Sequence, residues 1–145
     1  MKQIKPISAS ETVIVRHPVL RKGMPIATCK FNGDENSTTV HFGYFEANQI
    51  VGVVSLFAVK NEVFETELQF QIRGMAVLEN QQKKGIGKAL ILHSESFATQ
   101  QKTELIWFNA REHAVPFYIK MGYKITGAPF EIDAIGTHYL MYKRC

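Results

Sequence analysis

The stretch that decides the fold class is Gln82-Lys83-Lys84-Gly85-Ile86-Gly87-Lys88-Ala89. It follows a predicted strand, Phe70–Val77, and it opens a predicted helix that runs from about Gly85 to Gln100. The first backbone N–H groups of a helix have no partner within the helix and lie at the positive end of its dipole. Glycine lets the backbone approach a bulky anion closely, and the lysines add positive charge. The stretch therefore predicts a loop that binds a phosphate or pyrophosphate.

Two common phosphate-binding motifs do not fit this loop. A P-loop ends in Gly-Lys-Ser or Gly-Lys-Thr, whereas Gly87-Lys88 is followed by Ala89, and the position of its first glycine is Gln82. A dinucleotide fingerprint needs a third glycine where this chain has Leu90. The pattern that remains is Gln-x-x-Gly-x-Gly. Alone, it leaves two interpretations open, a ligand-binding loop and a glycine-containing loop without function.

A second run of residues follows further along the chain. Asn109-Ala110-Arg111 comes directly after a predicted buried strand, Leu105–Phe108. Ala114, Phe117-Tyr118 and Gly122-Tyr123 follow, on and after a predicted helix, Ala114–Met121, that Gly122 ends. The two runs, in this order and with one helix and one strand between them, resemble the motifs of the GNAT N-acetyltransferases. The resemblance covers roughly Thr39 to Tyr142 and is strongest over Arg73–Tyr123.

The resemblance implies the GNAT-type acyl-CoA N-acyltransferase fold, in the mixed α/β class. Its central sheet is mostly antiparallel and splayed in the middle, with helices on both faces. The residue patterns agree with one such domain over 1–145, and Gly74 predicts a bulge or a close backbone approach in the third strand. The other predicted elements are a first helix, a hairpin and two closing strands: Ser8–Leu20, Thr39–Phe45, Ile50–Phe57, Tyr123–Thr126 and His138–Tyr142.

Acetyl-CoA is the cofactor that the resemblance implies. Its pyrophosphate would lie on the glycine loop, against Gln82, Lys83, Lys84, Gly85, Ile86, Gly87 and Lys88. The strand residues Met75, Ala76 and Val77 would pair with the pantetheine arm through the backbone, and an N–H there could stabilise an oxyanion. Asn109 offers donors and an acceptor to the pantetheine amides. Phe117 and Tyr118 complete the expected cofactor site.

The resemblance also implies direct transfer of the acetyl group to a primary amine. Tyr118 would act as the general acid for the departing thiolate, and the alternative is a core aromatic on a helix face. Neither cysteine has an adjacent histidine, so a covalent acyl-enzyme is not expected.

The general base is not identified by the sequence. The glutamate that some relatives use as the base falls on Gln71, which cannot accept a proton, so Gln71 is expected on the substrate side. His138 suits a base or a link in a water chain, or else it is a structural histidine of the last strand. Arg73 would bind a carboxylate or phosphate of the acceptor, or else pair with a structural acid such as Glu46 or Glu62. Glu65 and Glu67 lie upstream, in no definite register.

Composition and charge limit the function classes. A chain of 145 residues that is 46% hydrophobic can bury a core without disulfides or a structural metal. The net charge is +4, and the basic residues gather at one loop instead of forming a stripe interleaved with aromatics, which argues against nucleic acid as a partner. No apolar run approaches the roughly 18 residues that span a bilayer, so no membrane partner is expected.

Cysteine and histidine usage adds two expectations. Cys29 and Cys145 form no disulfide framework and Met1–Ser10 has no apolar signal segment, so a reducing, cytoplasmic setting is expected. The histidines show no metal-ligand spacing, so no metal is expected. A non-catalytic acyl-CoA-binding sensor on the same fold stays open as the alternative function, since it would keep the Gln82–Ala89 loop without needing Tyr118. The acceptor stays open among small-molecule and peptide amines, as does a homodimer, which GNAT relatives often form.

Overall fold

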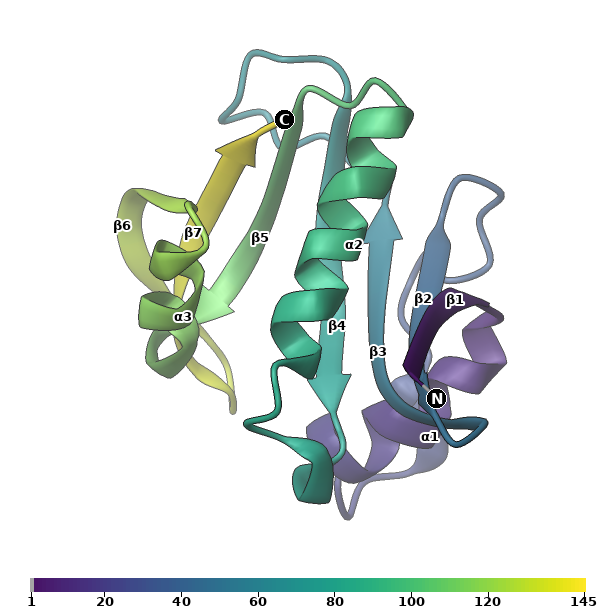
Figure 1. Cartoon of the computed structure of the whole chain (residues 1–145). Helices are drawn as coiled ribbons and strands as arrows, with labels where there is room; N and C mark the ends of the chain where they lie inside the picture. Colours follow the sequence, from purple (N-terminus) through teal and green to yellow (C-terminus); the bar gives the residue numbers. More distant parts are fainter. Residues whose placement is uncertain (1) are drawn as a thin grey trace. The chain divides into compact units, whose positions relative to one another are not determined.

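The computed structural model (Figure 1) describes residues 2–145. The chain divides into two compact units. Unit 1 comprises the residues up to Ala58 together with Ile72–Phe97, and unit 2 comprises Val59–Gln71 and Ala98–Cys145. Over the described residues, seven strands form one sheet in the order β1-β2-β3-β4-β5-β7-β6. The β4–β5 pair is parallel, whereas β1–β2, β2–β3, β5–β7 and β6–β7 are antiparallel. The predicted mixed, mostly antiparallel α/β sheet is confirmed.

Unit 1 carries the first half of the sheet and two long helices. Ser8 caps the first helix, since its side chain accepts from the Glu11 N–H while the Glu11 carboxylate accepts from the Ser8 N–H, so this predicted helix is confirmed. The predicted hairpin is also confirmed, and Ala47 and Asn48 turn it with φ of 51° and 65°. The elements are β1 Lys2–Ile7, α1 Ala9–Leu20, η1 Ile26–Cys29, β2 Val40–Glu46, β3 Gln49–Phe57, β4 Gln69–Val77, η2 Glu79–Gln81 and α2 Ile86–Gln100, of which β4 and α2 extend into unit 2.

Strand β1 is absent from the sequence prediction. Its six residues hold Pro6 and two lysines, and most are exposed, so they lack the apolar alternation by which a buried strand is recognised. It pairs along its whole length with β2, from Lys2 opposite Glu46 to Ile7 opposite His41. An edge strand with one pairing neighbour tolerates proline and lysine, which explains the missing signal.

The two helices of unit 1 cover opposite faces of its strands. Figure 1 shows α2 in front of these strands and α1 behind them. On the α1 side, Val15 packs in a cluster with Ile50, Val53 and Ala76. On the α2 side, a Cβ added at Gly52 would lie 3.0 Å from Ile86 Cγ2, so the glycine lets α2 approach β3 closely. The start of α2, and with it the glycine loop, is therefore fixed against the sheet.

Unit 2 carries the second half of the sheet. Besides the first residues of β4 and the last residues of α2, its elements are β5 Leu105–Arg111, η3 Glu112–Ala114, α3 Val115–Lys120, β6 Lys124–Ile132 and β7 Gly136–Arg144. The predicted end of β5 at Phe108 is wrong, because Asn109, Ala110 and Arg111 continue the strand and pair with Leu140, Tyr139 and His138 of β7. Both closing strands are also longer than predicted, since β6 keeps pairing with β7 despite a register shift between Thr126 and Phe130.

The core of unit 2 forms around Trp107. Phe64, Leu105 and Trp107 are buried together, and the Trp107 indole N–H donates to the Val59 carbonyl oxygen at 3.0 Å. The parallel ladder between β4 and β5 joins Gln69–Gln71 to Leu105–Trp107, whereas β4 continues to Val77 and β5 to Arg111. This pairing of β4 with β5 thus lies within unit 2, and the splay of the sheet stays a prediction.

Candidate active site

The glycine loop connects β4 to α2 within unit 1. Gln82 anchors its start, because the side-chain amide donates to the Val77 carbonyl oxygen at 2.9 Å. Lys83 and Gly85 both have positive φ, 65° and 83°, and the loop turns at these residues into the helix. A Cβ built on Gly85 would meet nothing within 4 Å, so the backbone there faces open space. This exposed backbone at the start of a helix, with lysine side chains around it, fits an anionic phosphate group.

The side chains of the loop divide into an anchor and a set open to the ligand. Ile86 is 3% exposed and packs in the core, while Gly87 is half-buried in the first turn of α2. The residues that stay exposed are Gln82, Lys83, Lys84, Gly85 and Lys88. The positive charge predicted at the loop is thus available at its surface.

The end of β4 lies next to this loop in the chain. Ala76 is buried in the core of unit 1, and Met75 and Val77 on either side of it are half-buried. Gly74 has φ of 65°, and a Cβ added there would lie 2.9 Å from Phe31 Cε2. The predicted close backbone approach at Gly74 is confirmed.

Tyr118 of unit 2 lies in an aromatic cluster. Its ring centroid is 4.4 Å from that of Phe108, 5.1 Å from Phe117 and 6.1 Å from Tyr123. Burial raises the pKa of Tyr118 to about 12. Among residues 2–145, no partner accepts a hydrogen bond from its hydroxyl group. The ring thus packs as a core aromatic would, yet its phenolic proton has no structural partner.

The other predicted residues of unit 2 have different surroundings. Asn109 is exposed on β5, and Phe117 is 37% exposed on α3. His138 is 4% exposed, and its Nδ1 lies 2.8 Å from the Gly136 carbonyl oxygen. If Nδ1 carries the proton for this bond, Nε2 is left as the acceptor. Gln71 is half-buried in the part of β4 that pairs with Trp107.

Arg73 has neither of the structural acids that the sequence suggested. Instead its guanidinium carbon lies 5.0 Å from the Phe31 ring centroid and 5.2 Å from that of Phe57. Burial lowers the pKa of Arg73, and the charges of Arg16 and Arg21 lower it further, against an opposing effect of Asp34. Within the described part of the chain, no carboxylate forms an ion pair with this arginine.

A buried polar network next to Arg73 is missing from the sequence prediction. Arg16 on α1 is fully buried and forms a two-point pair with Asp34, with N–O distances of 2.7 and 3.1 Å. It also donates to the Cys29 carbonyl oxygen and to Ser55 Oγ, which lies 2.6 Å from His41 Nδ1. Thr12, Val15, Arg16 and Val19 share the spacing of one helix face, a signal that would have placed Arg16 in the interior.

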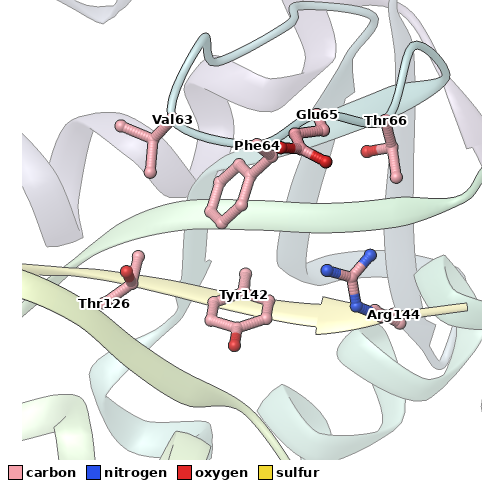
Figure 2. A pocket seen from close by; sticks show the side chains of 7 residues that line it. All are labelled: Val63, Phe64, Glu65, Thr66, Thr126, Tyr142 and Arg144. Atoms are coloured by element: carbon pink, nitrogen blue, oxygen red, sulfur yellow. The ribbon is translucent and has the colours of Figure 1, made fainter.

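A separate pocket of about 330 Å³ opens in unit 2 (Figure 2). Phe64 and Tyr142 face one another in it, with ring centroids 5.1 Å apart, and Glu65 and Arg144 bring charges to its wall. Glu65, the upstream acid to which the sequence assigned no definite register, lines this pocket, and the other predicted site residues do not. Within residues 2–145, no group of three or more His, Cys, Asp or Glu side chains is placed to hold a metal ion. The helices over the same residues are too short or too polar to cross a bilayer.

Comparison with known proteins identifies the family. A model of the acetyltransferase (GNAT) domain matches residues 26–144. The chain belongs to the GNAT acetyltransferase family. The uncharacterized N-acetyltransferase YitI of Bacillus subtilis (strain 168) is 35% identical over 144 residues, which covers 99% of this chain and 96% of the relative. The resemblance drawn from the two motifs is confirmed.

Solved GNAT structures share the fold of this chain. An aminoglycoside 6'-N-acetyltransferase complexed with coenzyme A has a TM-score of 0.78 at 15% identity and matches 98% of this chain and 96% of its own. Arabidopsis thaliana NAA60 in complex with acetyl-CoA has a TM-score of 0.76 at 14% identity and matches 99% of this chain and 98% of its own. At such identities the likeness concerns the fold alone.

Proposed function

We propose that this GNAT protein transfers an acetyl group from acetyl-CoA directly to a primary amine of a small molecule or peptide. The observation that carries the proposal is the glycine loop. Its backbone faces open space at Gly85, its lysines are exposed, and it leads into the first turn of α2. Two proteins of the same fold were solved with coenzyme A or acetyl-CoA bound, which supports the same ligand here.

The proposed cofactor site follows the family motifs. When bound, acetyl-CoA supplies the acetyl group in an activated thioester. The loop from Gln82 to Lys88 would hold the pyrophosphate through its backbone N–H groups and lysines. The backbone of Met75, Ala76 and Val77 would hold the pantetheine arm together with Asn109 and Phe117.

Tyr118 is the proposed general acid. A pKa of about 12 keeps the phenol protonated at every physiological pH, so the proton is always available for donation. Since no described residue accepts a hydrogen bond from this hydroxyl group, donation breaks no bond of the fold. His138 is the proposed proton acceptor for the amine, through Nε2, with Nδ1 oriented by the Gly136 carbonyl oxygen.

The remaining proposals concern the whole chain. We take the two units as parts of one acetyltransferase domain over 1–145, since the family match includes residues of both. Cys29 is a buried free thiol, which supports a reducing, cytoplasmic setting. A homodimer, as GNAT relatives often form, is testable by light scattering. The alternative function is an acyl-CoA-binding sensor, which would bind acetyl-CoA without turnover.

Calorimetric titration with acetyl-CoA tests the proposal. We expect saturable binding to the wild type and none to Gly87→Glu, because the new carboxylate would face the pyrophosphate in the first turn of α2. Ser96→Glu is the matched control, since it adds the same charge at an exposed position of the same helix. Absence of binding to the wild type refutes the proposal. Binding without acetylation of any amine in a broad screen favours the sensor.

A further inference from the structure

We propose that Arg73 and Arg21, which both lie beside the Phe31 ring, bind a carboxylate of the acceptor, so that the substrates of this enzyme are amines that also carry a carboxylate. The inference rests on the proposed acetyltransferase function. It adds the chemical class of the acceptor and the residues that select it. All the residues that carry it lie in unit 1.

Positive charge is in excess around the Phe31 ring. The guanidinium carbons of Arg16, Arg73 and Arg21 lie 3.9, 5.0 and 5.3 Å from its centroid. Asp34 is the one carboxylate that pairs with any of them among the described residues, and both of its oxygens bind Arg16. Arg73 and Arg21 are therefore left without a neutralising anion.

Arg16 cannot be the group that receives a ligand. It is fully buried, and its two terminal nitrogens donate to Asp34, Ser55 and the Cys29 carbonyl oxygen. Asp34 in turn accepts from the Phe31 N–H at 2.9 Å. This network holds the segment after α1 in place and fixes the Phe31 backbone. Arg16 and Asp34 thus position the site without contacting the ligand.

Arg73 has two aromatic neighbours and no carboxylate partner among the described residues. Its guanidinium carbon lies within cation–π distance of two rings, Phe31 and Phe57. A ring takes up no N–H donor of the guanidinium in the way that a carboxylate does, so these donors can bind a carboxylate of the ligand in the two-point geometry that arginine favours. The side chain is half-buried, so a ligand at this edge would be partly shielded from water. Partial burial strengthens an ion pair relative to one on an open surface.

The position of Arg73 in the chain connects the carboxylate site to the reaction. Arg73 is two residues before Met75, whose backbone is proposed to hold the pantetheine arm, and strand residues advance by about 3.3 Å each. Gly74 lies between them, and its missing Cβ leaves room for Phe31 Cε2 and Arg16 Nε. A carboxylate on Arg73 would therefore lie within one small molecule's length of the proposed acetyl-transfer position.

The first experiment measures binding at Arg73 directly. The Nε–H signals of the arginines are followed by NMR, Arg73 is assigned with Arg73→Gln, and the protein is titrated with N-acetylglycine or with N-acetylglycinamide. We expect the carboxylate to shift the Arg73 signal and the amide to leave it unchanged. Equal shifts with both compounds, or none with the carboxylate, overturn the proposal. If inorganic phosphate shifts the signal and N-acetylglycine does not, the site binds phosphate and the carboxylate assignment is wrong.

The second experiment measures selectivity in turnover. Amino acids are compared with their α-amides as acceptors, by release of the coenzyme A thiol. For Arg73→Gln we expect kcat/KM with the amino acids to fall roughly 10- to 100-fold, the range of one hydrogen bond to a charged group, while the amides change little. Arg21→Gln should act in the same direction, and Arg73→Lys should restore part of the loss. Lys22→Gln is the matched control, because it removes a positive charge from an exposed neighbour of Arg21.

The two proposals fail in different ways. If the wild type binds no acetyl-CoA in the calorimeter, the acetyltransferase function is wrong, and the Arg73 titration still decides whether a carboxylate site exists. If acetyl-CoA binds but amino acids and their amides are acetylated equally well, the carboxylate site is wrong and the acetyltransferase function stands. Acetyl-CoA binding by Arg73→Gln should equal that of the wild type.

Discussion

Replacing Gly74 by alanine perturbs the point where β4 meets the Phe31 ring and Arg16. Gly74 has φ of 65°, and a new Cβ would lie 2.9 Å from Phe31 Cε2 and 3.2 Å from Arg16 Nε. Gly23 provides a matched control. It has φ of 78°, and a Cβ there would meet nothing within 4 Å. Both substitutions place alanine in the left-handed region, but one of them also adds a steric clash.

The expected magnitudes follow from these two contributions. Left-handed backbone costs an alanine about 1–2 kcal/mol, which applies to both variants. Arg16 is held by its hydrogen bonds and cannot retreat, so the Phe31 ring has to move. Forcing a methyl group into a packed site costs about 1–3 kcal/mol more. We expect Gly74→Ala to lower the free energy of unfolding by about 2–5 kcal/mol, and Gly23→Ala by about 1–2 kcal/mol.

Urea unfolding measures both variants. Far-ultraviolet circular dichroism reports the whole chain, and fluorescence of Trp107, the single tryptophan, reports unit 2. Coincident transitions would show that the two units unfold together. Equal losses of stability for Gly74→Ala and Gly23→Ala would refute the argument from close approach. Where the variant folds, displacement of Phe31 should raise KM for a carboxylate-bearing acceptor and leave acetyl-CoA binding unchanged.

Three further predictions follow from the site. Asp34→Asn should destabilise the protein by about 3–5 kcal/mol, because it leaves Arg16 buried without its counter-charge, whereas Glu35→Gln at the exposed neighbouring position should cost less than about 0.5 kcal/mol in urea unfolding. Burial alone would raise the pKa of Asp34, but hydrogen bonds from Arg16 and the Phe31 N–H outweigh it, so the pKa falls below 3.8. The stabilisation is therefore present above that value and is lost as the pH falls through the lowered pKa. In Asp34→Asn the free energy of unfolding should no longer show this loss at acid pH. Tyr118→Phe should lower kcat about 100- to 10,000-fold with unchanged acetyl-CoA affinity. In the pH profile of the wild type, kcat should not fall near pH 10 through ionisation of the phenol. An unaltered kcat in Tyr118→Phe would show that Tyr118 takes no part in the reaction. Arg73→Gln should raise the apparent pKa at which kcat levels off, because kcat reports the bound amine, and an unchanged kcat profile would show that its charge does not reach the amine.

The sequence predicted the motifs of the candidate site better than the strand ends and the buried polar network around them. The glycine loop and the Phe117-Tyr118 run were recognisable because short motifs determine them locally. The hairpin and both long helices followed from apolar periodicity and capping residues. Strand β1 gave no such signal, because an edge strand needs only one partner and tolerates Pro6. The predicted end of β5 at Phe108 is wrong, because the apolar run stops there whereas pairing with β7 extends the strand to Arg111.

The Arg16 network shows a different limit of the sequence. Nothing local to Asp34 indicates that it pairs with a helix residue 18 positions earlier, because such a pair depends on tertiary packing. The helical spacing of Thr12, Val15 and Arg16 carried the one available signal. Arg73 is recognisable in the sequence because a charge in an apolar strand needs a partner. The sequence could not predict the partner of Arg73. In the structure its guanidinium lies near two aromatic rings and not beside an acidic residue.

Arg73 and Arg21 also affect how the acceptor amine could lose its proton, since Gln71 cannot act as a general base. An alkyl ammonium has a pKa near 10, and attack on a thioester needs the neutral amine. A positive charge within about 4–6 Å of an ammonium disfavours its charged form, so Arg73 and Arg21 would lower the pKa of an amine held beside them. A simple cationic amine would be repelled from this site, whereas an acceptor with its own carboxylate would be attracted. Selection of the carboxylate and deprotonation of the amine would then follow from one excess of charge, although Gln71 itself cannot act as a base.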